Sequence, residues 1–385
     1  AMIKVGAAHS ADVDAYQQHR GISLLSGWLP ITIEAVAIIL LIAVLLRRSR
    51  RWWFVWLPVS LACGAVTAWS AYRWFSSAGL ASDPAPTTLW WWIGAAGIAA
   101  AALVVGFVGA GWWRRVVGVL AVVATALAIG VVLDQWVGYF PTVEVAWAQL
   151  TAGPLTGQTD LTALPAMRGH PMAHGVVVPV SIPDTTSHFA HRTEYVYLPP
   201  AWFAGATPPP LPALMVIAGE FNTPADWIRI GNIVPIVDAY AAAHHGAAPI
   251  LVFPDVGGRF NNDTECVDGP RGAVADHLTD EVRPFTVDTF HAAASPDAWG
   301  VVGWSMGGTC AVDLVTMHPD LFHTFDDIAG DAAPASGDRA QTIDRLFGGS
   351  VAAYDSYDPT VVMRRHGAYQ GVHGVFDETS TSGRH

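Results

Sequence analysis

Four apolar runs in the first part of the chain most constrain how it can fold. They cover residues 28–46, 52–74, 89–111 and 116–137. Each approaches the ~20 residues that a helix needs to cross a bilayer. A secretory signal peptide explains them poorly, because the first run starts late and three more follow. The sequence therefore predicts four transmembrane helices over residues 28–138, after an N-terminal segment of residues 1–27.

Positive charge in the connections predicts how these helices are oriented. Residues 47–51 include four arginines, and Arg114 and Arg115 lie between the third and fourth runs. The connection over residues 76–88 has no Lys or Arg. Connections rich in Lys and Arg stay on the cytoplasmic side. We therefore expect a multi-pass protein of the cell membrane, with residues 1–27 and everything after residue 137 on the extracytoplasmic side.

Glu34 lies inside the first run, where an ionisable residue can mark a functional site. It is only six residues past Trp28, so a position near the lipid headgroups is the favoured interpretation. We interpret the helices as an anchor, with the lipid bilayer as a partner.

The composition after the membrane region excludes one class of partner. Residues 151–385 hold 11 Arg, no Lys and 26 Asp or Glu. Binding to nucleic acid needs a basic face, so a nucleic-acid partner is not expected. Cys63, Cys266 and Cys310 show no metal-binding spacing and make a disulfide framework unexpected, with at most one bridge after the membrane region.

Short apolar runs alternate with helix-length segments from residue 175 onward. The candidate strands are residues 176–182, 193–198, 213–218, 249–254, 299–304, 325–329 and 372–376. The candidate helices are residues 233–244, 275–293 and 308–318. This alternation predicts a doubly wound, mostly parallel α/β sheet over residues 175–385, with residues 139–174 as a linker and the Pro-rich stretch 207–212 as a loop.

The pattern G-x-S-x-G over residues 303–307 places Ser305 between a candidate strand and a candidate helix. In a nucleophile elbow, glycines allow a tight strand-to-helix turn that exposes the serine hydroxyl and frees the next backbone N–H. An ordinary Gly-rich turn is the alternative. The context favours Ser305 as the nucleophile of an acyl-transfer reaction.

An acyl-transfer site also needs two N–H groups that bind the oxyanion. The residue after the nucleophile, Met306, would supply one. The loop after the third strand would supply the other from Glu220 or, failing that, Phe221. An ordinary turn after Gly219 is the alternative interpretation of that loop.

The acid and the histidine of the expected triad should follow the nucleophile in that order. Asp377 comes directly after the last candidate strand, with Glu378 beside it, although a solvated loop carboxylate is nearly as good an interpretation. His366 and His373 precede this acid, and His385 is the final residue. We therefore expect the chain to be truncated at its C-terminus, with the catalytic histidine beyond residue 385.

Metal sites are less well supported. Asp263, Glu265 and Asp268 could bind a hard cation, but the run lacks the glycine and terminal glutamate of an EF-hand. Three histidine pairs are poor candidates for metal ligands: His170 with His174, His188 with His191, and His244 with His245. The sequence predicts no metal and no organic cofactor.

Several motifs occur in one order that resembles the esterase D-like branch of the α/β hydrolases, which includes the mycobacterial mycolyltransferases. They are residues 213–219 followed by Trp227, residues 253–258, the elbow with Met306 over residues 303–308, and residues 318–322. A four-helix anchor before such a domain also looks like uncharacterised actinobacterial membrane esterases. Ala218 stands where the mycolyltransferases have an acidic residue, and no arginine follows before Arg229. Trehalose is therefore not implied as the acyl acceptor.

The resulting hypothesis is a membrane-anchored, outward-facing serine esterase or acyltransferase. It would act on ester substrates, including lipid or cell-envelope esters, through an acyl-enzyme at Ser305 oriented by Asp377. The alternative is a catalytically incomplete envelope protein that uses the hydrolase fold to bind a ligand.

Overall fold

The computed structural model describes residues 21–46, 49–78, 85–107, 111–151, 153–259 and 261–377. Predictions about residues 1–20, Arg47, Arg48, Glu378 and His385 lie outside the described residues. The chain divides into two compact units, one that ends at Ala152 and one that covers Gly153–His385.

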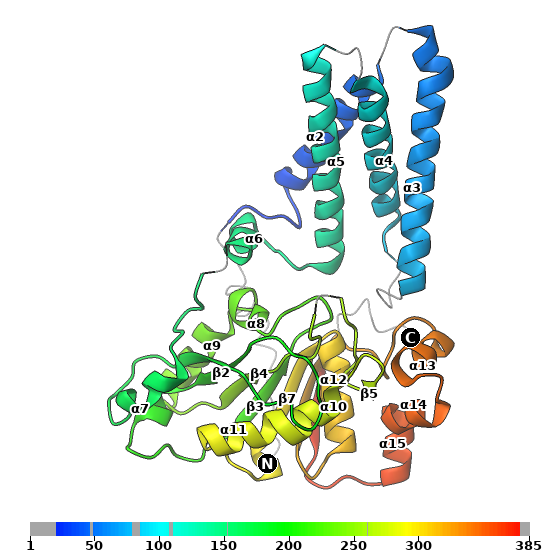
Figure 1. Cartoon of the computed structure of the whole chain (residues 1–385). Helices are drawn as coiled ribbons and strands as arrows, with labels where there is room; N and C mark the ends of the chain where they lie inside the picture. The colour runs from blue at the N-terminus through cyan, green and yellow to red at the C-terminus, as the bar shows by residue number, and fades with distance from the viewer. Residues whose placement is uncertain are drawn as a thin grey trace. The chain divides into compact units, whose positions relative to one another are not determined.

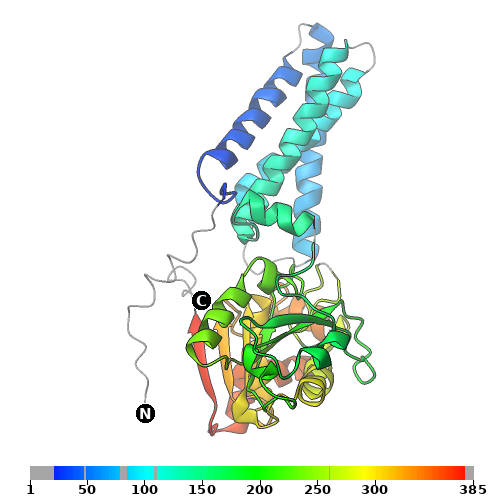
Figure 2. The same cartoon turned by 90° about the vertical axis from the view of Figure 1, so that its left-hand side faces the viewer.

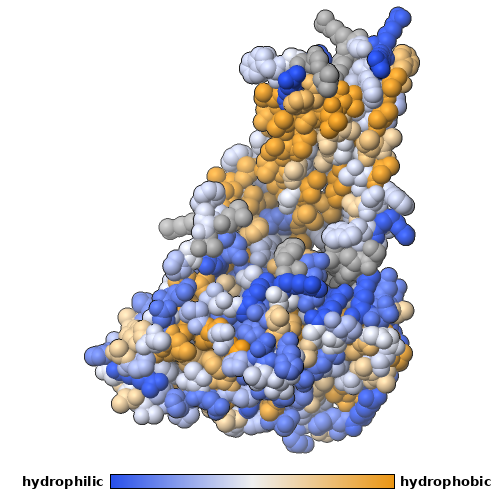
Figure 3. Space-filling model, viewed as in Figure 1, coloured by the Kyte–Doolittle hydropathy of each residue, from blue (hydrophilic) through white to orange (hydrophobic). Residues whose placement is uncertain are grey.

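The first unit is helical. Helix α2 spans Trp28–Leu45, a π-helical turn over Trp52–Trp56 continues into α3 over Leu57–Ala78, α4 spans Thr87–Phe107 and α5 spans Trp112–Val137. The four predicted helices are confirmed, and each is long and apolar enough to cross a membrane. Figure 3 shows the hydrophobic surface of these helices.

Small residues let neighbouring helices approach closely. Helix α2 packs against α5, and α4 packs against both α3 and α5. A Cβ at Gly64 would lie 2.6 Å from the carbonyl oxygen of Gly94, so the backbones of α3 and α4 meet there. Such contacts between small residues are typical of helix packing in membranes.

The segments before α2 and after α5 lie together. Ser23 and Thr142 form an antiparallel bridge, and the N–H of Leu24 donates to the Pro141 carbonyl at 3.1 Å. The chain therefore enters and leaves this helical unit at the same end. Helix α6, over Val143–Leu150, follows at once and is capped by the Thr142 side chain.

The second unit is built on a seven-stranded sheet. Its strands are β1 Val176–Val180, β2 Glu194–Leu198, β3 Ala213–Ile217, β4 Ile250–Phe253, β7 Trp299–Trp304, β8 Thr324–Ile328 and β9 His373–Asp377. The order across the sheet is β1-β2-β4-β3-β7-β8-β9, and β2 runs antiparallel to both its neighbours while the rest are parallel. All seven predicted strands are confirmed, and the sheet has the α/β-hydrolase fold.

Alternate residues of β1, β2, β3, β4 and β7 serve two apolar cores, one on each face of the sheet. Figure 1 shows the helices that lie against the sheet. Met215 and Ile217 pack on the face covered by α11 (Arg283–Phe290) and α12 (Met306–Met317), whereas Val216 packs toward α9 (Ile233–Ala243) on the other face. Burial on both faces explains why these strands are continuously apolar in sequence. Figure 2 shows the same layers from the side.

The remaining elements of this unit are short. They are η2 Leu161–Ala163, α7 Leu164–Met167, η3 Pro200–Phe203, α8 Asp226–Arg229, β5 Asp268–Gly269, β6 Gly272–Ala273, α10 Val274–Asp276, η4 His277–Val282, η5 Pro296–Ala298, α13 Arg339–Phe347, α14 Val351–Tyr357 and α15 Pro359–His366. The predicted linker over residues 139–174 therefore contains helical segments, and Leu164 within it packs into the core.

Cys266 and Cys310 form a disulfide, and both side chains are buried. It is the one bridge that the sequence allowed after the membrane region. It joins the loop that follows β4 to helix α12, five residues after Ser305.

Candidate active site

Ser305 occupies the turn between β7 and α12. Its backbone has φ 57° and ψ −123°, a conformation that L-residues rarely adopt. The residue is exposed, whereas its neighbour Met306 is buried at the first position of the helix. The local geometry is that of a nucleophile elbow, with the hydroxyl accessible to a substrate.

The glycines around Ser305 are required by contacts with backbone atoms. A Cβ at Gly303 would overlap the backbone of Gly307, and a Cβ at Gly307 would overlap the carbonyl of Ile217 at the end of β3. Helix α12 can therefore start directly over β7 and β3 only if both positions lack a side chain.

The predicted oxyanion donors are the N–H groups of Met306, at the start of α12, and of Glu220, in the loop after β3. Ile217 pairs with Gly303 in the sheet, so the loop after β3 begins beside the elbow. A Cβ at Gly219 would lie 3.3 Å from the Trp304 carbonyl oxygen. Among the described residues, no acceptor takes a hydrogen bond from the amide of Met306 or Glu220. Two unused N–H groups beside Ser305 have the arrangement that an oxyanion hole needs.

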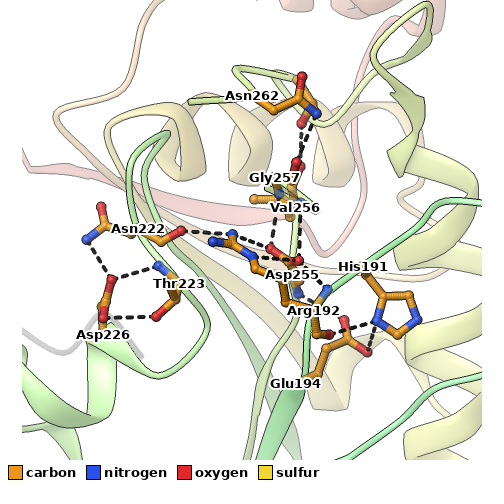
Figure 4. Close-up of polar contacts among 12 residues, drawn as sticks. His191, Arg192, Glu194, Asn222, Thr223, Asp226, Asp255, Val256, Gly257 and Asn262 are labelled. Carbon is orange, nitrogen blue, oxygen red and sulfur yellow. Dashed lines mark hydrogen bonds and ion pairs between the residues drawn. The ribbon is translucent and has the colours of Figure 1, made fainter. Parts of the chain in front are cut away.

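An arginine holds the loop that carries Glu220 (Figure 4). The guanidinium of Arg192 donates to both carboxylate oxygens of Asp255, at 2.6 and 3.0 Å, and to the carbonyl oxygen of Asn222 at 3.0 Å. Burial raises the pKa of Asp255, but the hydrogen bonds and charge of Arg192 outweigh burial and leave that pKa lowered. Asp255 is 1% exposed, so this pair ties the loop firmly to the end of β4.

The side chain of Glu220 has an unusual environment. Burial, together with the negative charge of Asp263, raises its pKa to about 8, while Arg271 opposes the shift. Glu220 is therefore mainly protonated at neutral pH. A neutral side chain beside the N–H groups does not repel a developing oxyanion.

Asp377 lies at the carboxyl edge of the sheet, where Ser305 also lies. Trp304 pairs with Ile328 and Ile328 with Asp377, so the acid is two strands from the nucleophile at the same level. Strands are about 4.8 Å apart, which leaves about 10 Å between the two backbones, enough for an imidazole between the side chains. Asp377 is the last residue of β9, whereas the prediction placed it directly after the strand.

The described histidines after Ser305 lie elsewhere. His373 pairs with Thr324 and Thr324 with Gly300, four residues before Trp304, which is about 13 Å down the strand. The N–H of His373 donates to the carbonyl of His323 at the same edge, and His366 ends α15 before β9 begins. His366 stacks on Tyr369, whose hydroxyl donates to the Thr316 carbonyl near the end of α12 that is far from Ser305, and His318 follows that helix. The described histidines after Ser305 therefore lie away from the elbow.

Asp263, Glu265 and Asp268 do not converge on one point. Asp263 pairs with Arg271 at 3.4 Å, whereas Asp268 accepts the hydroxyl of Tyr357 at 2.9 Å. Burial and the charge of Asp263 raise the pKa of Glu265 well above its usual range. Within the described part of the chain, these three do not form a group with metal-ligand spacing.

The sequence patterns did not predict a buried cluster that contacts Asp255, the partner of Arg192. His191, Glu194 and His277 approach one another, and Glu281 joins His277 at 2.7 Å. The spacing of His277 and Glu281 by four residues was the available signal. The contact with Glu194, 83 residues earlier than His277, exists only in the folded chain.

A cavity of about 560 Å³ lies against α9 and contains none of the predicted site residues. Val234, Pro235 and Asp238 line it, and Asp238 faces His174 there at 3.3 Å.

Known proteins share sequence similarity with this chain. Residues 189–371 match the family model described as Putative esterase. An uncharacterized protein of Corynebacterium glutamicum is 32% identical over 267 residues, a match that covers 67% of this chain and 62% of that relative's length.

Solved structures with a similar fold were also found. A ferulic acid esterase is 16% identical with a TM-score of 0.40, over 53% of this chain and 88% of that one. An S-formylglutathione hydrolase from Agrobacterium tumefaciens is 19% identical with a TM-score of 0.41, over 52% and 74%. MPT51 (FbpC1) of Mycobacterium tuberculosis is 18% identical with a TM-score of 0.33, over 48% and 70%.

The matched residues contain the elbow, the loop after β3 and strands β2 to β8. Residues 189–371 are thus similar to the family described as Putative esterase, and the sheet that they build is of the α/β-hydrolase type.

Proposed function

We propose that this protein is a membrane-anchored serine esterase or acyltransferase whose acyl-enzyme forms on Ser305. The observation that carries the proposal is the elbow itself. An exposed serine at φ 57°, between a buried strand and the first turn of a buried helix, is hard to explain as a structural turn. Backbone strain of this kind persists where function uses it.

The chemistry follows from the positions of the named groups. The Ser305 hydroxyl attacks the ester carbonyl as a histidine takes its proton, and the N–H groups of Met306 and Glu220 stabilise the oxyanion. Collapse expels the alcohol, which takes the proton back from the histidine. Water or a second hydroxyl compound then attacks the acyl-enzyme and gives its proton to the histidine. The bond between the acyl group and Ser305 breaks, and the histidine returns the proton to the Ser305 oxygen, so the identity of the acceptor decides between hydrolysis and transfer.

Asp377 is the proposed acid that orients the histidine. The proposed place of that histidine is a segment after β9, in the order serine, acid, histidine.

The proposed site faces away from the cytoplasm. The arginines of residues 47–51 and 114–115 support this orientation. The Cys266–Cys310 disulfide gives independent support, since disulfides persist in oxidising compartments and are rare in the cytosol. A membrane-bound site on that side favours lipid or cell-envelope esters as substrates.

A fluorophosphonate probe tests the nucleophile directly. We expect it to label the protein in membranes of its natural host, and we expect Ser305→Ala to abolish the labelling. The matched control is Ser356→Ala, at an exposed serine of α14, which should label as the wild type does. A folded wild-type protein that takes no label would instead support a non-catalytic binding protein.

A further inference from the structure

The cluster of His191, Glu194 and His277 has the arrangement of a metal site. The three side chains come from the segment before β2, the first residue of β2 and the first residue of η4. Their exposed fractions are 8%, 0% and 0%, and their ligand atoms all lie within 4.8 Å of one another.

The distances between these atoms suit one small cation. His277 Nε2 is 3.1 Å from Glu194 Oε1, and His191 Nδ1 is 3.5 Å from Glu194 Oε2. Two ligands of a tetrahedral zinc ion, at bonds of about 2.0–2.1 Å, lie roughly 3.3 Å apart. The pairs of nitrogen and oxygen therefore have the separation of neighbouring ligands.

Each histidine is also held from behind by an oxygen. Glu281 Oε2 is 2.7 Å from His277 Nδ1, and the Ile182 carbonyl oxygen is 2.8 Å from His191 Nε2. Glu281 is itself held by the N–H groups of Thr186 and Ser187. Partners of this kind keep the proton on one ring nitrogen and direct the other nitrogen toward a metal.

The same contacts surround the nitrogens of both rings with oxygen atoms. His277 has a carboxylate oxygen at both nitrogens, and His191 has a carbonyl oxygen at both, since the Arg192 carbonyl lies 2.9 Å from Nδ1. The two rings stack with centroids 4.6 Å apart, so they belong to one buried cluster.

A divalent ion would stand between the two rings and the Glu194 carboxylate. It also provides a partner for Glu194 Oε2, a buried oxygen that accepts no hydrogen bond. The Arg192 carbonyl oxygen lies 2.9 Å from His191 Nδ1 and would serve as a fourth ligand of the ion.

We propose that His191, Glu194 and His277 bind a divalent first-row transition ion, with zinc as the expected metal. Two imidazoles and a carboxylate are a donor set that zinc favours. The site is enclosed by protein, so its role is structural. Glu194 Oε1 also accepts the N–H of Asp255 at 2.9 Å, which links the ion to the Arg192 pair beneath the loop that carries Glu220.

Metal analysis of the purified full-length chain in detergent tests the site. After expression with added zinc and dialysis against metal-free buffer, we expect about one zinc per chain. Removing it with a chelator should lower the Tm by about 5 °C or more, and added zinc should restore it. Cobalt in its place should give the visible absorption of a tetrahedral ion.

His191→Gln should lose the metal, whereas His174→Gln should keep it, because His174 is 78% exposed and faces Asp238. If His191→Gln does not fold, the zinc content and cobalt spectrum of the wild type still decide. Wild-type protein that holds no transition metal, and whose Tm does not respond to zinc, would overturn the proposal and leave a buried ion-pair cluster.

Discussion

The backbone of Ser305 departs from the conformations that L-residues prefer, at a cost of about 1–3 kcal/mol. Surrounding hydrogen bonds hold it there. Its N–H donates to the Ile328 carbonyl at 2.9 Å, and its own carbonyl accepts the N–H of Gly308 at 2.7 Å. The strain is therefore offset by the sheet on one side and the first turn of α12 on the other.

Gly307→Ala tests how tightly this turn is packed. The new methyl group would meet the Ile217 carbonyl, so we expect a loss of about 2 kcal/mol of unfolding free energy and weaker probe labelling. Thermal unfolding and labelling measure the two effects. Gly153→Ala is the control, because nothing lies within 4 Å of the Cβ position there. Equal stability of the two variants would contradict the packing argument.

The raised pKa of Glu220 predicts a pH dependence of labelling. Burial and Asp263 raise that pKa to about 8, so the carboxyl group is neutral below this pH and charged above it. If the charged form blocks the oxyanion site, the rate of fluorophosphonate labelling at pH 9 falls to about a tenth of its maximum. Glu220→Gln should remove this fall. Identical profiles for the two proteins would show that another group controls the alkaline limb.

The raised pKa of Glu220 also determines how this residue changes the stability of the fold with pH. The folded-state pKa of Glu220 lies above the ordinary value of 4.5, so the fold opposes its ionisation. Glu220 therefore reduces stability as pH rises from about 4.5 to about 8. Glu220→Gln should flatten the unfolding free energy over that range.

At the scale of elements, the loop after β3 depends on a contact that is distant in sequence. Arg192 precedes β2, Asp255 follows β4, and together they hold the Asn222 carbonyl. Asp226 adds a local brace, since it accepts the N–H of Thr223 at 2.7 Å. Three strands thus contribute to the position of one oxyanion donor.

Arg192→Gln should disturb this loop. It leaves the buried Asp255 carboxylate without its charged partner, so we expect a loss of about 3 kcal/mol of stability. We also expect labelling to slow by about tenfold, as the loop donor moves. Arg339→Gln is the control, because the Arg339–Asp355 pair is 59% and 31% exposed and contributes less than about 1 kcal/mol. A similar loss in both variants would argue against a positioning role.

At the scale of the whole molecule, the chain combines a helical unit with an α/β unit. Fusions to alkaline phosphatase, an enzyme that is active only outside the cytoplasm, test the proposed orientation. We expect a fusion after Thr151 to be active and a fusion after Arg51 to be inactive. Fluorescent-protein fusions at the same positions should give the opposite pattern. The reverse outcome would place the elbow in the cytoplasm.

Local patterns in the sequence determined the elements of this protein. The four spans follow from apolar length, and the strands follow from short apolar runs bounded by Gly, Pro or Asp, because a sheet covered on both faces needs them. Ser305 followed from its flanking glycines, since the elbow is a local structure whose steric needs are visible in five residues. The position of Asp377 at the end of the last strand followed from counting strands.

Contacts between distant residues were decided only by the tertiary structure. The Cys266–Cys310 bridge, the Arg192–Asp255 pair and the meeting of His277 with Glu194 each join separate elements. The raised pKa of Glu220 depends on Asp263, 43 positions away in a different loop. Burial and charge at these sites depend on which segments the sheet order brings together. No local pattern encodes that order, because it arises from packing the whole domain.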